Sequence, residues 1–141
     1  GAYNRRYFEE KIRKSTVSAG VAMIDLDDFK LYNDSFGHDT GDVVLISFVN
    51  IIKNCTRKTD MLIRYGGDEF LLILDDPAPG EINRIIQQVK TELSSGTGTT
   101  GLRILAAVGS AEGCGADIRS LVKKADAAMY SDKAKSKEGR S

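Results

Sequence analysis

The sequence predicts one α/β (α+β) domain, in which helices flank a central, mostly antiparallel sheet that we expect to have five strands. The first observation is size, because 141 residues form one domain of common length. The second is composition, since 41% hydrophobic and 28% charged residues are typical of a globular protein with a real core. The third is that strand-like and helix-like segments are mixed and two strands form a hairpin. We treat residues 1–141 as a single domain, and because the chain starts at Gly1 rather than Met we expect it to be cut from a longer multidomain protein.

The overall charge is balanced, with 20 Lys and Arg against 20 Asp and Glu. A balanced chain gives no reason to expect nucleic acid as a partner, or direct contact with a membrane surface. No apolar run has membrane-spanning length and no secretory signal is visible. We therefore expect a cytoplasmic domain, which a longer chain could still tether to a membrane protein. For Cys55 and Cys114 we favour two reduced thiols over a disulfide, which their number alone would permit.

The first part of the chain contains one predicted strand among three predicted helices. Residues 8–12 suggest a short amphipathic helix. Residues 19–24 are a continuous apolar run that ends at Asp25 and has the length of a buried strand. A short helix is expected over residues 29–36, and a longer one follows with Asp39 as its N-cap. Apolar residues between positions 43 and 52 give this longer helix a broad, mostly buried stripe.

The next part is a predicted hairpin, because residues 61–65 and 70–74 are strand-like and the Gly pair between them permits a tight turn. A helix follows, with predicted inward residues Ile82, Ile85, Ile86, Val89 and Leu93. Residues 94–101 are rich in Gly, Ser and Thr, but no Lys follows the glycines as it would in a phosphate-binding P-loop.

The chain closes with a strand predicted at 102–108 and a helix predicted at 118–133, followed by a polar tail that we expect to fray. The predicted inward residues of this last helix are Leu121, Val122, Ala125, Ala128 and Met129.

Two acidic clusters are candidate metal sites. Asp25, Asp27 and Asp28 follow the first buried strand, and Asp68 with Glu69 lies at the tip of the hairpin. Mg²⁺ prefers oxygen ligands and is commonly held by one or two carboxylates together with substrate phosphates. If the strand at the first acidic cluster and the hairpin are neighbours in the sheet, Asp25 and Asp68 could converge on one pair of metal ions. Such an arrangement resembles that of polymerase palm domains. The alternative is that these acids are solvated turn residues.

Other polar residues invite a nucleotide, although each has a simpler explanation. The glycines around His38 allow a ligand to approach the backbone closely. Asn33 and Asp42 offer the donors and acceptors that would read a guanine edge. Asn33 could instead cap a turn, and His38 could make one structural hydrogen bond. Arg57 and Asp60, three positions apart, would by themselves form a local ion pair.

Five separated segments complete a pattern along the chain. The central one is Arg64-Tyr65-Gly66-Gly67-Asp68-Glu69-Phe70. The others are Leu26-Asp27-Asp28-Phe29-Lys30 with Asn33-Asp34, Gly37-His38-Asp39-Thr40-Gly41-Asp42, Asn4-Arg5-Arg6, and Ala125-Asp126-Ala127-Ala128-Met129-Tyr130 with Lys133. Together they resemble the GGDEF family of diguanylate cyclases from end to end. The family's opening D-x-L-T stretch is absent.

The resemblance implies a fold like that of polymerase palm domains and nucleotide cyclases, with two Mg²⁺ or Mn²⁺ ions in each active site. The implied metal ligands are Asp25, the backbone carbonyl of Leu26, Asp68 and Glu69, of which Asp68 and Glu69 are also catalytic. The implied guanine site is Asn33, Asp42 and His38. The implied phosphate site comprises backbone N–H groups of Asp28 and Phe29 and the side chains of Lys30, Lys133 and either Lys137 or Arg140. Gly66 and Gly67 would allow the hairpin to close over the α-phosphate.

The activity implied by the resemblance joins two GTP molecules into cyclic di-GMP and releases two pyrophosphates. Two domains would meet head to tail, so that a homodimer forms the complete site, and an upstream sensory or receiver domain would control it. Arg57 lies nine positions before Gly66, where the family has its inhibitory site, so Arg57 and Asp60 would bind cyclic di-GMP as an inhibitor.

Two alternatives remain to the active cyclase. One is a catalytically weak domain that binds GTP or cyclic di-GMP and regulates an attached module. The other is a cyclase with an adenine-containing product, which Asn33 and Asp42 fit less well.

Overall fold

The structure, a computed structural model, describes residues 18–26, 38–65, 69–94 and 106–140, with side chains for all of these except 38–44 and 135–140. The elements in chain order are β1 (Ser18–Leu26), α3 (His38–Cys55), β2 (Met61–Arg64), β3 (Glu69–Asp75), α4 (Glu81–Ser94), β4 (Ala106–Cys114), the short 3₁₀ helix η1 (Gly115–Asp117) and α5 (Ile118–Arg140).

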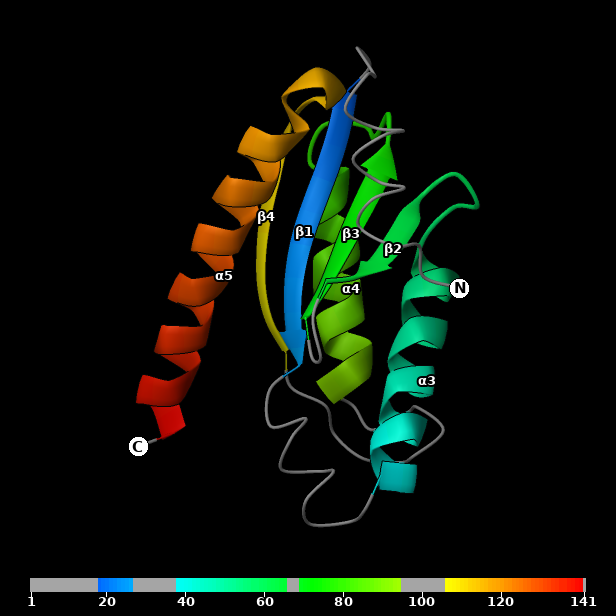
Figure 1. Cartoon of the computed structure of the whole chain (residues 1–141), viewed down its shortest axis with the longest axis vertical. Helices are drawn as coiled ribbons and strands as arrows, with labels where there is room; N and C mark the ends of the chain where they lie inside the picture. Colours follow the sequence, from blue (N-terminus) through cyan, green and yellow to red (C-terminus); the bar gives the residue numbers. More distant parts are fainter. Residues whose placement is uncertain (1–17, 27–37, 66–68, 95–105, 141) are drawn as a thin grey trace.

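The strands of the described ranges form one antiparallel sheet with the order β2-β3-β1-β4 (Figure 1). β1 is central because it pairs with β3 on one side and with β4 on the other. Every residue from Ala19 to Leu26 is buried, which agrees with an apolar run covered on both faces. The antiparallel α+β architecture is thereby confirmed. The described ranges contain four strands, so the count of five is not confirmed.

The strand side chains alternate between two cores, one on each face of the sheet. Helices α3 and α4 cover one face, where Ile24 and Leu72 pack with Phe48. Helix α5 covers the other face, where Val21 and Leu71 pack with Met129. Figure 1 shows α5 lying along β4 while α4 lies behind the sheet. Side chains of α4 and α5 can therefore meet around the edge of the sheet at β4.

The predicted hairpin and long helices are confirmed, with corrections in detail. All five predicted inward residues of α4 are buried. On α3, Ile46 is 58% exposed, so the apolar stripe is narrower than predicted. This helix begins at His38, which places Asp39 inside it rather than at its N-cap. On α5, Ala128 is exposed, because the helix packs through Ala125 and Met129 instead.

The largest correction concerns the last strand, which is Ala106–Cys114 rather than 102–108. Its two glycines are poor strand formers, so its sequence does not look like a strand. It forms because all nine of its residues pair with β1. The predicted tail is also wrong in part, since α5 continues to Arg140. Residues 102–105 and the helices predicted at 8–12 and 29–36 lie outside the described residues.

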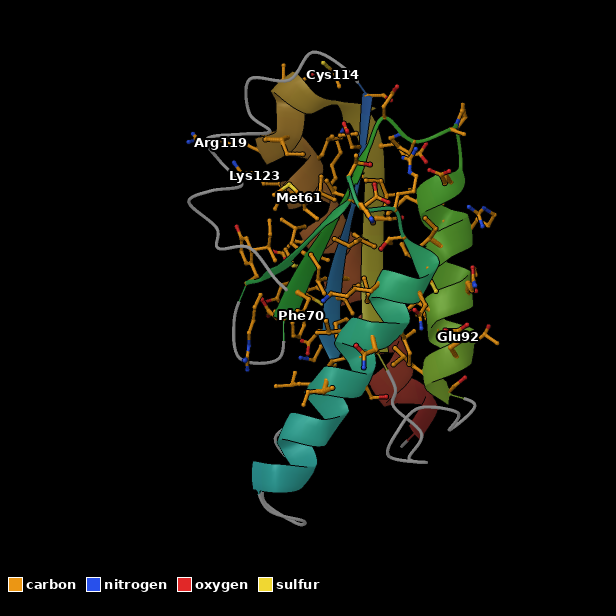
Figure 2. All side chains as sticks on the ribbon, turned by 90° about the vertical axis from the view of Figure 1, so that its right-hand side faces the viewer. Met61, Phe70, Glu92, Cys114, Arg119 and Lys123 are labelled. Atoms are coloured by element: carbon orange, nitrogen blue, oxygen red, sulfur yellow. The ribbon has the colours of Figure 1, made fainter. Side chains whose placement is uncertain are left out.

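Both cysteines are free thiols, as the sequence favoured. Figure 2 shows Cys114 at the end of the domain where β4 leads into α5, whereas Glu92, which contacts Cys55, lies farther along on α4. Within the described ranges, no helix combines the length and apolar character needed to span a membrane.

Candidate active site

The end of β1 places a buried carboxylate beside the start of β3. Asp25 is 2% exposed. It pairs in register with Glu69, the first residue of β3. Residues that lie directly opposite in an antiparallel pair project their side chains on the same face. Asp25 follows Val21 and Met23 at intervals of two residues along β1, so its side chain lies on the same face as theirs, which is the face that α5 covers.

Helix α5 delivers a cation to the same place. Lys133 Nζ donates a hydrogen bond to Asp25 Oδ2 at 2.7 Å. The Asp25 side chain is 3% exposed and that of Lys133 is 30% exposed. A buried carboxylate is unfavourable without a partner, and the ammonium group supplies one. The two residues are 108 positions apart in the chain, so the packing of α5 on the sheet creates this pair.

The oxygen donors at this end of the sheet suit a divalent cation. Asp25 and Glu69 offer carboxylates, and Leu26 offers a backbone carbonyl at the last position of β1. Such hard oxygen ligands are those that Mg²⁺ and Mn²⁺ prefer. Among the residues that the structure describes, no three His, Cys, Asp or Glu side chains gather into a metal-binding group. Asp68, the other predicted metal carboxylate, lies outside the described residues, so the described donors form a compatible part of the set.

The remaining residues predicted to bind nucleotide are only partly located. Those outside the described residues are Asp28, Phe29, Lys30, Asn33, Gly66 and Gly67. The backbone places His38 at the start of α3 and Asp42 one turn later. It places Lys137 one turn beyond Lys133 on α5. The structure therefore brings together Asp25, Glu69 and Lys133, and the roles of the others stay predictions.

Arg57 and Asp60 lie near the opposite end of the sheet, where β3 ends at Asp75. The Asp60 side chain is 1% exposed. Its Oδ2 accepts a hydrogen bond from Arg57 N at 2.8 Å, and its Oδ1 accepts one from Asp75 N at 3.0 Å. Asp60 therefore fastens the α3–β2 connection to the end of β3, a role that the sequence did not suggest.

The Arg57 side chain is held in place but remains open to solvent. Its guanidinium donates to Asp75 O at 2.7 Å, and the Arg57 side chain is 54% exposed. The same nitrogen is 3.7 Å from Asp60 Oδ1 and 3.7 Å from Glu81 Oε2. The local ion pair considered from the sequence is therefore a loose one, and more than half of the Arg57 side chain stays exposed to solvent.

A cavity of about 290 Å³ opens beside this pair, between the end of α3 and β2. This volume is at the lower end of the range for small-ligand sites. Its lining includes the cations Lys53, Arg57 and Lys58 and the apolar side chains Ile52 and Met61. The carboxylate in the lining is that of Asp60, which already accepts hydrogen bonds from two backbone N–H groups. That charge distribution favours an anionic ligand.

One polar contact near the active site was missed by the sequence reasoning. Asp132 Oδ2 accepts hydrogen bonds from Lys90 Nζ at 3.1 Å and from Val108 N at 2.9 Å. The sequence did contain a signal for an inward position, because Asp132 follows the inward-facing residues Ala125 and Met129 by seven and three positions. This spacing places a carboxylate on the inward face of α5, where a polar group needs a partner.

The chain is similar to known proteins over almost its whole length. The family described as "Diguanylate cyclase, GGDEF domain" matches residues 1–139. The response regulator PleD of Caulobacter vibrioides is 32% identical over 148 residues, covering 95% of this chain and 33% of PleD. The probable diguanylate cyclase DgcC of Escherichia coli is 34% identical over 144 residues, covering 94% of this chain and 39% of DgcC. The chain thus spans 33–39% of the length of these two relatives.

Among solved structures, the GGDEF domain of DgcB from Caulobacter crescentus, in complex with c-di-GMP, superposes with a TM-score of 0.79. It is 27% identical, and the match covers 94% of this chain and 86% of that one.

Proposed function

The chain belongs to the GGDEF domain family, and from this premise we propose that it is the catalytic domain of a diguanylate cyclase, which converts two GTP into cyclic di-GMP and two pyrophosphates. The observation that carries the proposal is the register of β1 against β3. It sets the buried Asp25 opposite Glu69, which follows Gly66-Gly67-Asp68 in the sequence, and Lys133 donates a hydrogen bond to the Asp25 carboxylate. Carboxylates and an ammonium group at one strand end are what a metal-dependent phosphoryl transfer requires.

Asp25, Glu69 and the carbonyl of Leu26 would hold two Mg²⁺ or Mn²⁺ ions together with Asp68. A bound divalent metal would supply the positive charge that stabilises the phosphoryl group during its transfer. The protein's own side chains would do the remaining work of binding and orientation. Lys133 would move from Asp25 to the terminal phosphates, because an ammonium group is a mobile point charge with three donors. No covalent enzyme nucleophile is needed, since the attacking group is the 3′-hydroxyl of a second GTP.

Each domain would present one GTP, and two domains would meet head to tail to complete the reaction. Holding the two GTP molecules in line makes a bimolecular reaction effectively unimolecular, which would be the main catalytic contribution of such a protein. Asn33, Asp42 and His38 would read the guanine of each GTP. A homodimer is therefore part of the proposal, and the isolated domain would lose activity on dilution.

The cavity beside Arg57 supports a second binding site for the product. Its excess of cations suits the phosphates of cyclic di-GMP. Because Arg57 is 54% exposed while Asp60 is 1% exposed, Arg57 would make the first contact with the ligand. Both carboxylate oxygens of Asp60 already accept hydrogen bonds from backbone N–H groups, so Asp60 could accept a guanine N–H only as an additional hydrogen bond to one of them. Binding here would restrain the cyclase and give product inhibition.

The cyclase proposal is tested by product formation from GTP and Mg²⁺, followed by mass spectrometry over a wide range of protein concentration. We expect cyclic di-GMP to rise more than linearly with protein, and to disappear in Asp68→Ala. Asp117→Ala, which removes an exposed carboxylate far along the chain, is the matched control and should retain the product. Absence of product, even when a fused coiled coil enforces dimerisation, would refute the cyclase and leave a nucleotide-binding regulator. ATP supplied beside GTP tests the alternative product.

A further inference from the structure

One carboxylate oxygen connects three layers of the domain at the edge of the sheet. Asp132 lies on α5 and Lys90 on α4, and these helices cover opposite faces (Figure 1). Both reach β4, the end strand of the described sheet, where Asp132 Oδ2 accepts from Lys90 Nζ at 3.1 Å and from Val108 N at 2.9 Å. The Lys90 and Asp132 side chains are only 33% and 34% exposed, so the contact is partly shielded from solvent. It fixes α5 laterally against the strand edge.

A second feature fixes the depth of α5. At Gly109, the neighbour of Val108, a Cβ atom would lie 2.1 Å from Ala125 O and 2.2 Å from Met129 N. The helix backbone therefore rests directly on the strand backbone at this point. Asp132 lies one turn beyond Met129, so the two contacts together determine how far α5 can roll and slide on β4.

We propose that Asp132 is a positioning residue for Lys133, the side chain that reaches the active-site carboxylate. The residue after Asp132 places Nζ 2.7 Å from Asp25 Oδ2. A roll of α5 that released Asp132 from the edge of β4 would carry Lys133 away from β1, because adjacent helical residues move as one rigid unit. The contact thus sets where the ammonium group stands when nucleotide arrives. The consequence for nucleotide affinity rests on the proposed cyclase function, whereas the positioning itself does not.

The first measurement follows Lys133 without any ligand. In ¹⁵N-lysine-labelled protein, the ammonium signal that is lost in Lys133→Met identifies this residue. We expect Asp132→Ala to move that signal to the position of a solvated lysine, because the ion pair with Asp25 is no longer held. Lys90→Met should act in the same direction but less, since Val108 N–H still binds Asp132. Asp117→Ala should leave the signal unchanged. An unchanged Lys133 signal in Asp132→Ala overturns the inference.

The second measurement is calorimetric binding of 3′-deoxy-GTP with Mg²⁺, which cannot react because it lacks the attacking hydroxyl. We expect Asp132→Ala to raise Kd about tenfold, the size typical of losing an outer partner that orients a ligand-binding group. In a Lys133→Met background, Asp132→Ala should add nothing, because its effect passes through Lys133. Additive losses in the double variant would mean a general structural role and would overturn the inference. A wild type that binds no 3′-deoxy-GTP would refute the proposed function, while the lysine signal still decides the positioning.

Discussion

Gly109→Ala is expected to be among the most damaging small substitutions in this domain, because one methyl group would enter the contact between β4 and α5. The new Cβ would lie 2.1 Å from Ala125 O, 2.2 Å from Met129 N and 2.7 Å from Ala128 C. All three are backbone atoms, so no side-chain rotation relieves the clash. To restore an ordinary contact, α5 must withdraw by roughly 1 Å, and close-packed interiors do not absorb such a shift locally.

The size of the effect follows from two losses of stability and one smaller gain. Inserting a methyl group into a packed interior costs typically about 1–3 kcal/mol, and a backbone-only contact belongs at the top of that range. The withdrawal also separates Leu121, Ala125 and Met129 from the sheet, and a gap of about 1 Å forfeits up to roughly half of each dispersion contact. Replacing Gly with Ala restricts the unfolded chain and returns about 0.4–1 kcal/mol. We expect a net loss of about 3 kcal/mol, which is a large fraction of the roughly 5–15 kcal/mol of a typical domain.

Urea unfolding followed by circular dichroism measures this loss, with two other glycines as internal controls. At Gly113 the nearest atom is Leu121 Cδ2 at 2.9 Å, the end of a flexible side chain, so Gly113→Ala should cost under about 1 kcal/mol. Gly80 has φ +78° and no atom within 4 Å, so Gly80→Ala should cost about 1–2 kcal/mol through the backbone alone. If Gly109→Ala is no more destabilising than Gly113→Ala, the close approach of α5 to β4 is wrong.

Two further predictions concern the other end of the sheet and the α3–α4 contact. Arg57→Ala should raise the cyclic di-GMP concentration needed for half inhibition at least tenfold, which corresponds to about 1.4 kcal/mol of lost binding free energy. If the variants Arg57→Ala and Arg84→Ala, the control, need the same concentration for half inhibition, Arg57 is excluded from the site. Burial is the largest cause that raises the pKa of the Cys55 thiol above its ordinary value of 9.0, and the nearby Glu92 carboxylate is the second. The stabilisation associated with the neutral thiol is therefore present below pH 9.0 and is lost as pH rises through the pKa of the folded state. Glu92→Gln should shift the alkylation profile of Cys55 to lower pH in a Cys114→Ser background, and an unmoved profile would contradict the contact.

The sequence located most elements because their signals are local. The apolar run at 19–24 has the length of a strand, and the spacing of the isoleucines in α4 marks one helix face. The Gly pair between two apolar runs indicates the hairpin. The predicted bounds of the last strand were wrong, because Gly109 and Gly113 in β4 carry no strand signal of their own. These glycines are explained only by the helix that lies against them.

The sequence by itself determined which chemistry is available, since the carboxylates, the glycine turn and the lysine of α5 are present at recognisable positions. The tertiary structure decided which of them meet. The β1–β3 register sets Asp25 opposite Glu69, and the packing of α5 brings Lys133 to Asp25 across 108 positions and Asp132 to Lys90 across 42. It also buried Asp60 against backbone donors. Local patterns extend over one or two turns of a helix, whereas these contacts depend on strand order, register and the placement of a helix on the sheet, which the whole core determines.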